Sequence, residues 1–426
     1  MTRRLPPPVR IYQVGGSVRD ELLGRPVADR DFVVVGATPE IMLASGFVPV
    51  GKDFPVFLHP DTHDEYALAR TERKHGHGYR GFQFFATPDV TLEEDLARRD
   101  LTINAMARAP DGTLIDPYGG KTDLAAGVLR HVSAAFAEDP LRVLRVARFA
   151  ARFGFRIADE TLALMRAIVV AGELPTLAPE RVWQEIARGL CEASPSRMLD
   201  ALRACGALAI VLPEIDALYA IRVHAVPTVS NAGELTARAL DHAAASAATL
   251  PARYATLAQQ LDLVDPEDRR SHGGGATRVD VRRGLSRVEA LSRRLRVPVD
   301  CRDAARLAVR WHRKVAEVRT LGPAALLDLL LAADALRRPE RLDALVAASA
   351  ALMIAQSGDE QVGPLPGVWL RAARDVVRHV DAAAIARDAI ARAAQGAPSR
   401  NAGERVATAL RAARLRALRE WKRQMR

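Results

Sequence analysis

Cysteine is scarce in this 426-residue sequence, and long apolar runs are missing. Its three cysteines, Cys191, Cys205 and Cys301, are widely spaced and form no CxxC, which argues against a disulfide framework or a thiolate zinc site. No segment approaches the roughly 20 apolar residues that cross a bilayer, and residues 1–8 carry charges without the apolar stretch of a secretory signal. We therefore expect a cytoplasmic protein with no membrane partner.

The composition is that of an ordinary globular protein, with 49% hydrophobic and 26% charged residues, and the length predicts several domains. Lys and Arg number 61 against 51 Asp and Glu, which gives a net charge of +10. Such an excess favours a polyanionic partner or merely solubility. More than half of it lies in residues 401–426, where apolar side chains recur at helical spacing (Leu415, Leu418, Trp421, Met425). This segment is predicted to be a basic amphipathic helix.

The chain changes character near residue 137. Before it, short β-type runs at 10–14, 31–35, 56–58, 65–69 and 81–85 alternate with probable helices at 18–23 and 39–45. After it, Ala, Leu and Arg dominate with helical periodicity. The sequence thus predicts an α+β head with a mixed sheet, residues 1–137, followed by an all-helical neck, body and tail at 138–220, 221–355 and 356–426.

Two short motifs in the head point to phosphate chemistry. A strand ends in Gly15-Gly16 and a helix follows, so the backbone can approach an anion closely, with Arg19 on the first turn as a fixed cation. Asp29 and Asp31 lie at i, i+2 at the start of the next strand, and both carboxylates face the same side. Two like charges this close favour a bound cation, and hard oxygen ligands suit Mg²⁺.

A resemblance covers nearly the whole chain. The segments Gly15–Gly24, Asp29–Asp31, Arg98–Ala105, Ile115–Gly120 and Glu138–Phe149 resemble the motifs of the class II CCA-adding enzymes, most closely the multifunctional members. These tRNA nucleotidyltransferases belong to the superfamily related to DNA polymerase β. The resemblance implies template-independent addition and repair of the CCA end of tRNA from CTP and ATP, with release of pyrophosphate and Mg²⁺ on Asp29 and Asp31.

The motif at 98–105 is expected to begin a helix with Asp100 and Asn104 on one face. Arg99 can bind the triphosphate, with Gly16 and Arg19, while Asp100 and Asn104 are suited to orient ribose hydroxyls. Standing alone, the motif would read as a helix-capping Asp beside exposed arginines.

Asp139 and Arg142, three residues apart, are expected on one face of the next helix. An ionised Asp accepts hydrogen bonds and an Arg donates them, so the pair matches the amine donor and ring-nitrogen acceptor of cytosine and of adenine, but not of uracil or guanine. Arg145 and Arg148 continue the row and could hold phosphates. Without the other motifs, the same residues would read as an intrahelical salt-bridge ladder.

Residues 70–81 are basic and glycine-punctuated, which predicts a loop over the active site. The resemblance implies that such a loop serves the change from CTP to ATP. Glu65 is a weaker candidate for the same metals. A zinc site made of His59, His63, His75 and His77 lacks the accompanying cysteines.

The body departs from the multifunctional relatives, whose HD phosphohydrolase domain binds a metal through adjacent His-Asp. Gln259 and Gln260 stand at that position here, and neutral Gln cannot replace it as a metal ligand. We expect that the hydrolase chemistry is lost, although His242, Asp262 and His312 could form a substitute site. Three alternatives stay open: a poly(A) polymerase with the same head, a silent tRNA-binding module and a retained hydrolase. Monomer and homodimer also both stay open.

Overall fold

The computed structural model describes residues 6, 8–27, 29–50, 56–74, 82–85, 87–223, 229–264, 278–359, 364–394 and 402–425. The chain divides into two compact units, residues 1–211 and 212–426, and each has its own hydrophobic clusters. Among the described helices, none is long and apolar enough to span a membrane.

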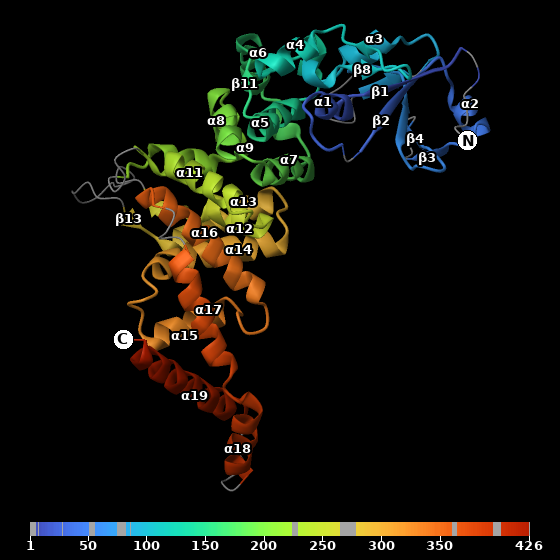
Figure 1. Ribbon diagram of the computed structural model, residues 1–426. Helices are drawn as coiled ribbons and strands as arrows, with labels where there is room; N and C mark the ends of the chain where they lie inside the picture. Colours follow the sequence, from blue (N-terminus) through green and yellow to red (C-terminus); the bar gives the residue numbers. More distant parts are fainter. Residues whose placement is uncertain are drawn as a thin grey trace. The chain divides into compact units, whose positions relative to one another are not determined.

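A seven-stranded mixed sheet forms the centre of the first unit, in the order β3-β4-β5-β2-β1-β8-β9. The β2–β5 pair is parallel, and the other neighbours pair antiparallel. Of these strands, Figure 1 labels β1–β4 in blue and β8 in cyan. Their bounds are β1 Arg10–Val14, β2 Asp31–Val35, β3 Val48–Val50, β4 Val56–Leu58, β5 Glu65–Leu68, β8 Ala107–Arg108 and β9 Leu114–Ile115.

Alternating side chains give the sheet two apolar faces. Val34 packs in one cluster with Met42 of α2 (Pro39–Ala44), whereas Val33 packs in another with Leu96 of α3 (Leu92–Ala97). Successive strand residues point to opposite sides, so the run Phe32–Val35 supplies both clusters. The predicted strands at 10–14, 31–35 and 56–58 are confirmed with the same bounds.

The expected loop at 70–81 is wrong for its first part. Thr71–Lys74 forms strand β6, which pairs antiparallel with β7 (Phe82–Phe85). Residues 75–81, including His75 and His77, lie outside the described residues. The basic composition of 70–74 misled the prediction, because the pairing partner, the apolar run Phe82–Phe85, lies further along the chain.

Helices complete the first unit. In chain order they are α1 Gly16–Leu22, α4 Gly120–Ala126, α5 Leu141–Phe153, α6 Asp159–Val170, α7 Pro179–Cys191, α8 Ser196–Ala204 and α9 Leu208–Val211. α5 buries Val143, Leu144 and Ala147 and packs against both α7 and α8. The prediction of a purely helical chain beyond 137 misses β11 (Arg156–Ile157), which pairs parallel with β10 (Val128–Leu129).

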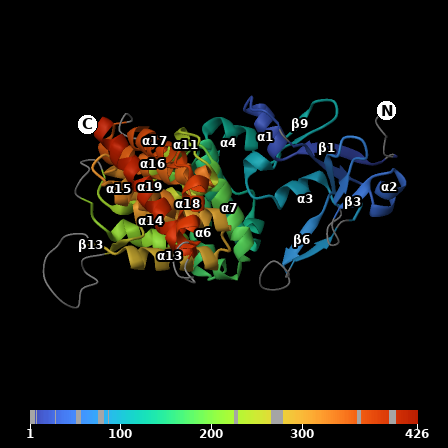
Figure 2. The same ribbon diagram turned by 90° about the horizontal axis from the view of Figure 1, so that it is seen from below.

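The second unit is helical apart from the two-residue strands β12 (Leu263–Val264) and β13 (Arg278–Val279). Its main cluster joins Ala255, Trp311 and Leu345. α14 packs on α16, α16 on α17, and α17 on α15 and α19, and Figure 2 shows these helices in orange to red, seen from below. The helix bounds are α10 Pro213–Asp216, α11 Ala232–Ala245, α12 Leu250–Ala258, α13 Val281–Arg294, α14 Val299–Ala316, α15 Pro323–Ala332, α16 Pro339–Ser357, α17 Pro364–Arg378, α18 Ala382–Ala394 and α19 Ala402–Gln424.

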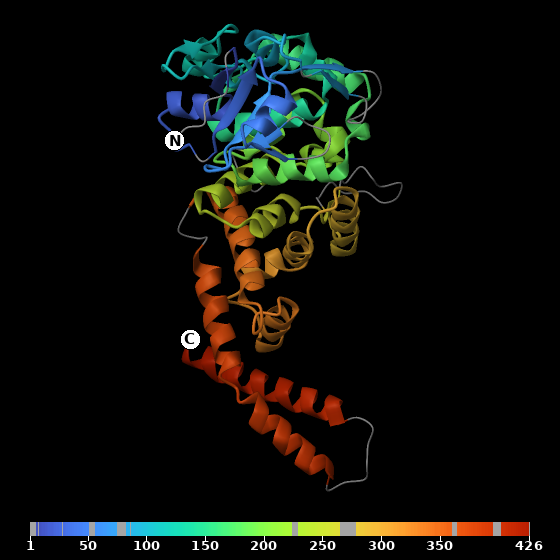
Figure 3. The same ribbon diagram turned by 90° about the vertical axis from the view of Figure 1, so that its right-hand side faces the viewer.

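The predicted amphipathic helix at the C-terminus is α19, which lies beside α18, as Figure 3 shows in red, and also packs on α15 and α17. Leu418 is fully buried, and Trp421 packs edge-on against Trp369 with ring centroids 5.2 Å apart. Met425 was expected on the same apolar face but is 52% exposed, because the helix ends at Gln424 and no further turn covers it. The four domain boundaries expected from the sequence stay a prediction.

Candidate nucleotide-binding and catalytic site

A cavity of about 860 Å³ lies in the first unit, between the sheet and α5. Every predicted site residue except Asp29 lines it: Gly16, Arg19, Asp31, Arg99, Asp100, Asn104, Asp139, Arg142, Arg145 and Arg148. Residues spread over more than 130 positions therefore meet in one place, and most of the polar groups are cationic. The sheet ends, the 98–104 segment and α5 each supply one wall.

The glycine turn forms one edge of the cavity. Gly15 has a φ of 72°, and a Cβ atom there would lie 2.7 Å from Nη1 of Arg99. Only glycine suits both the left-handed backbone and this approach. The turn thus admits the Arg99 guanidinium beside the start of α1.

The two aspartates stand at the entry of β2. Asp31 pairs in register with Val14, the last residue before the glycine turn, and with Glu65 of β5, which also lines the cavity. Burial of its carboxylate raises the pKa of Asp31, Arg99 opposes this shift, and the negative charge of Asp29 adds to it. As whole residues, Asp29 and Asp31 are both exposed.

Two neighbouring carboxylates carry like charges and hard oxygen donors, which suit a divalent cation, so the residues present fit Mg²⁺. Within the described part of the chain, no three His, Cys, Asp or Glu side chains form a metal-binding group. A metal here would draw its remaining ligands from a substrate or from water.

The prediction that residues 98–104 begin a helix is wrong. α3 ends at Ala97, Arg98 caps it, and Thr102–Asn104 form a single 3-10 turn. The buried carboxylate of Asp95 binds both Arg98 (2.6 Å) and Arg99 (3.3 Å). One acidic residue therefore pairs with both arginines at the end of α3, and the chain turns into the cavity immediately after them.

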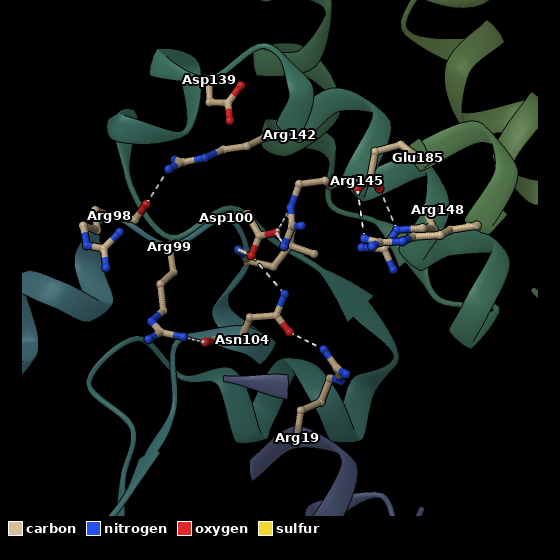
Figure 4. A network of polar contacts seen from close by, with 12 residues as sticks. Arg19, Arg98, Arg99, Asp100, Asn104, Asp139, Arg142, Arg145, Arg148 and Glu185 are labelled. Carbon is tan, nitrogen blue, oxygen red and sulfur yellow. Dashed lines mark hydrogen bonds and ion pairs between the residues drawn. The ribbon is translucent and has the colours of Figure 1, made fainter. Parts of the chain in front are cut away.

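Asp100 is the centre of a polar network, which Figure 4 shows. One oxygen accepts from Asn104 Nδ2 (2.9 Å) and the other from Arg145 Nε (2.8 Å). Burial alone would raise the pKa of Asp100, but the charge of Arg145 and the hydrogen bonds hold it below its usual range. The carboxylate stays ionised although the residue is only 6% exposed.

The network continues to α1. Asn104 Oδ1 accepts from Arg19 Nη1 at 2.5 Å, and Asp20 accepts from both Arg19 and Arg152 at 2.9 Å. Arg19 is only 3% exposed, so its charge has a fixed position at the cavity wall. Arg152 belongs to α5, which means that α1 and α5 share one acidic residue.

Asp139 does not lie on the helix with Arg142, as the sequence predicted. It is extended and precedes α5, where its Oδ1 accepts from the Leu141 N–H at 3.0 Å. Its Oδ2 pairs with Nη2 of Arg181 at 3.2 Å. Arg142 donates to the carbonyl oxygens of Ala135 (2.8 Å) and Arg98 (2.6 Å). Pro140 interrupts the helical pattern at this point and causes the difference.

Arg145 and Arg148, expected to contact phosphates, are already paired with carboxylates. Arg145 binds Asp100, and Arg148 donates from Nε to Glu185 of α7 at 2.6 Å. Sequence reasoning missed Glu185 and Arg181, which lie four residues apart on α7. The only sequence signal for them was their own spacing of four residues, because their partners, Asp139 and Arg148, lie about forty positions earlier in the chain.

Comparisons with known proteins agree with this geometry. Residues 11–130 match the family described as Poly A polymerase head domain, and residues 154–219 match one described as a probable RNA and SrmB-binding site of polymerase A. A multifunctional CCA protein of Dechloromonas aromatica is 58% identical over 78% of this chain and 81% of its own length. One of Burkholderia vietnamiensis is 54% identical over 89% and 93%.

The chain belongs to the family of CCA-adding enzymes. These are tRNA nucleotidyltransferases, as the sequence resemblance implied. Solved CCA-adding enzymes share the fold: that of Bacillus stearothermophilus in complex with CTP superposes with a TM-score of 0.66 at 22% identity, over 98% of this chain and 94% of that one. A CCA-adding enzyme with ATP gives 0.62 at 21%, over 95% and 86%. The predicted α+β head with a helical remainder is thereby confirmed.

In the second unit of this CCA-adding enzyme, the glutamines are part of the core. Gln260 accepts from the Thr236 hydroxyl (2.9 Å), and Gln259 donates to the Ala348 carbonyl (3.0 Å). Asp262 is fully buried and paired with Arg313. His312 Nδ1 is 2.8 Å from the Ala308 carbonyl. Across residues 229–264 and 278–359, no metal-binding group of three such side chains includes His242, Asp262 or His312.

Removing Asp100 should destabilise the first unit, because Arg145 and Asn104 would lose their shared, buried carboxylate partner. We expect Asp100→Ala to cost about 3 kcal/mol of unfolding free energy, and Asp100→Ala with Arg145→Ala to cost about 1–3 kcal/mol less than the sum of the singles. Urea unfolding followed through Trp183, the one tryptophan of this unit, measures it. Asp111→Ala, at an exposed turn of the same unit, is the control and should change little. Additive losses would contradict the pairing.

Proposed function

We propose that this protein adds and repairs the 3′-terminal CCA of tRNA without a nucleic-acid template, with CTP and ATP as substrates. The observation that supports this proposal most is that the glycine turn, Asp31 at the start of β2, and the side chains of Asp139 and Arg142 line one cavity. In the reaction, the 3′-hydroxyl of tRNA loses its proton and bonds to the α-phosphorus, while the bond to the β-phosphate oxygen breaks and pyrophosphate leaves. We place this activity in the cytoplasm.

Asp29 and Asp31 would hold Mg²⁺. The ion, when bound, supplies positive charge that favours the alkoxide form of the attacking hydroxyl and neutralises the leaving pyrophosphate. The raised pKa of Asp31 supports this assignment, because a nearby cation would relieve the repulsion from Asp29.

The triphosphate and the ribose are assigned to the network around Asp100. Gly16, Arg19 and Arg99 line the cavity beside Asp31 and would bind the phosphates. Asp100 and Asn104 hydrogen-bond to each other, and their other acceptor and donor positions would orient the ribose hydroxyls. Arg145 binds Asp100 and Arg148 binds Glu185, and the other N–H groups of these two guanidinium groups would donate to phosphates.

The base is assigned to Asp139 and Arg142. A carboxylate that accepts and a guanidinium that donates match the Watson–Crick edges of cytosine and adenine, whose amine donates and whose ring nitrogen accepts. Uracil and guanine offer the opposite pattern. Both side chains line the cavity, which supports a role of the protein in place of a template.

Incubation with tRNA lacking CCA and all four NTPs tests the proposal. We expect addition of two C and one A and then a stop. Asp31→Asn should lower the incorporation rate by about a thousandfold, because a metal-holding carboxylate is lost. Asp89→Asn, an exposed carboxylate of the same unit, is the control.

Open-ended addition of A would instead show a poly(A) polymerase. An unchanged rate in Asp31→Asn would refute the mechanism, and binding of tRNA without incorporation by the wild type would show a silent binding module.

A basic stripe on α19 supports a role in holding tRNA. Arg405, Arg416, Arg419 and Arg423 are exposed and recur at spacings that place them on one face, opposite the buried Leu418. Arg411 and Lys422 have other roles, since Arg411 pairs with Asp328 (2.7 Å) and Lys422 donates to the Arg319 and Leu321 carbonyls. The stripe is suited to contacts with phosphates that do not depend on sequence.

Arg419→Gln should raise KM for tRNA and reduce the slope of log KM against log salt by roughly 0.7–0.9, the value for one lost phosphate contact. Arg411→Gln is the matched control on the same helix, because its charge is already partnered, and its slope should change less. KM for CTP should stay the same in both. Equal slopes for Arg419→Gln and the wild type would contradict the proposal that this stripe contacts tRNA phosphates.

We further propose that the second unit has lost HD phosphohydrolase chemistry. The amides of Gln259 and Gln260 bond within the core, and Arg313 neutralises the buried Asp262. These contacts give the polar groups a packing role at the place where the resemblance puts metal ligands.

Hydrolysis of 2′,3′-cyclic AMP with Mg²⁺ or Ni²⁺ should therefore not exceed the rate without enzyme. Incorporation of CTP by the same preparation serves as the positive control. Turnover that depends on added metal would contradict this loss and restore the hydrolase reading.

A further inference from the structure

Arg181 of α7 reaches the residue to which base reading is assigned. Its Nη2 lies 3.2 Å from Oδ2 of Asp139, and both residues line the cavity. Their side chains are 28% and 23% exposed, so the pair lies at the cavity wall and not in the core. Asp139 is thereby held from two sides, since its other oxygen accepts from the Leu141 N–H.

Arg142 is held in a comparable way by groups outside the reading pair. Its two terminal nitrogens donate to the carbonyl oxygens of Ala135 and Arg98, and Figure 4 shows the contact to Arg98. Carbonyl oxygens fix the direction of a guanidinium without neutralising its charge. The guanidinium therefore keeps its charge and lies in the lining of the cavity.

Asp139 and Arg142 must be kept apart if both are to contact a base, because they carry opposite charges and lie three residues apart. Such neighbours are inclined to pair with each other. An Asp139–Arg142 pair would satisfy the acceptor with the donor, and both would be lost to a base. A cation that approaches Asp139 from another helix opposes this outcome and leaves part of the carboxylate's accepting capacity free, because an ionised carboxylate has about four lone-pair positions.

α7 has the geometry for this task. It forms two ion pairs one turn apart, Arg181 with Asp139 just before α5 and Glu185 with Arg148 on α5. The second pair is buried, with side chains 5% and 8% exposed, and fixes the helix in place. The helix that bears Arg181 is therefore fixed in position when Arg181 contacts Asp139.

We propose that Arg181 is a positioning residue for nucleotide selection. It turns the Asp139 carboxylate toward the base and prevents its collapse onto Arg142. This inference rests on the proposed function of the Asp139/Arg142 pair. It predicts that loss of Arg181 damages discrimination between bases more than the rate of phosphodiester formation, because the groups around Asp31 and Asp100 are untouched.

The test compares Arg181→Gln, Arg181→Lys and Arg188→Gln. Arg188 lies on the same helix, is 63% exposed and pairs at 3.9 Å with Glu185, so it is a matched control away from the cavity. kcat and KM are measured for CTP, ATP and UTP on tRNA lacking CCA, and binding of CTP and UTP is measured by calorimetry. A partly exposed ion pair contributes little to stability, so thermal unfolding of Arg181→Gln should match the wild type.

We expect Arg181→Gln to reduce the preference for CTP over UTP at least tenfold, mainly through a higher KM for CTP and weaker CTP binding, with kcat changed only a few-fold. Arg181→Lys should recover much of the preference, because it restores a cation beside Asp139, and Arg188→Gln should keep it. Parallel losses for all nucleotides with the preference intact would show a merely structural role and overturn the inference. A wild type that neither prefers nor binds CTP over UTP would instead refute the proposed function.

Discussion

The buried Asp100 carboxylate is the interaction on which the arrangement of the first unit depends. A charge taken out of water needs partners, and it finds them in Asn104 of the following turn and in Arg145 of α5. Asn104 in turn holds Arg19 on α1. One ionised group thus joins the glycine turn beside the sheet to the helix that bears Arg142.

The same principle explains how a cavity with so many arginines can exist before any substrate enters. Arg19 has Asp20, Arg148 has Glu185, and Arg99 shares Asp95 with its neighbour. Each pairing fixes a guanidinium in position and removes part of the repulsion among cations. A triphosphate bound as proposed would meet donors that are already oriented, and little reorganisation would remain to be done on binding.

Much of this could be predicted from the sequence, for reasons that are local. The strand at 31–35 is rich in valine, and its first residue, Asp31, is the second aspartate of the DxD motif. The sequence therefore marks the start of the strand and the candidate metal ligand at the same residue. Prediction failed where ion pairs at a helix end or a proline decided the backbone. The carboxylate of Asp95 binds both arginines that follow α3, and Pro140 keeps Asp139 out of α5. Arg181 was missed because its partner lies 42 residues away and nothing between them marks the pair.

The second unit resolves its own buried charge differently. Burial raises the pKa of Asp262, and its hydrogen bond with Arg313 opposes that shift. The partner is a fixed cation of the chain. A divalent ion at Asp262 would have to displace that guanidinium and bring its remaining ligands from neutral neighbours such as Gln260, whose carbonyl oxygen already accepts from Thr236. Both requirements cost free energy that a site built of His and Asp would not incur. The hydrogen bonds of the glutamines and the pairing of Asp262 with Arg313 therefore favour the same outcome, a helical unit stabilised by internal polar contacts.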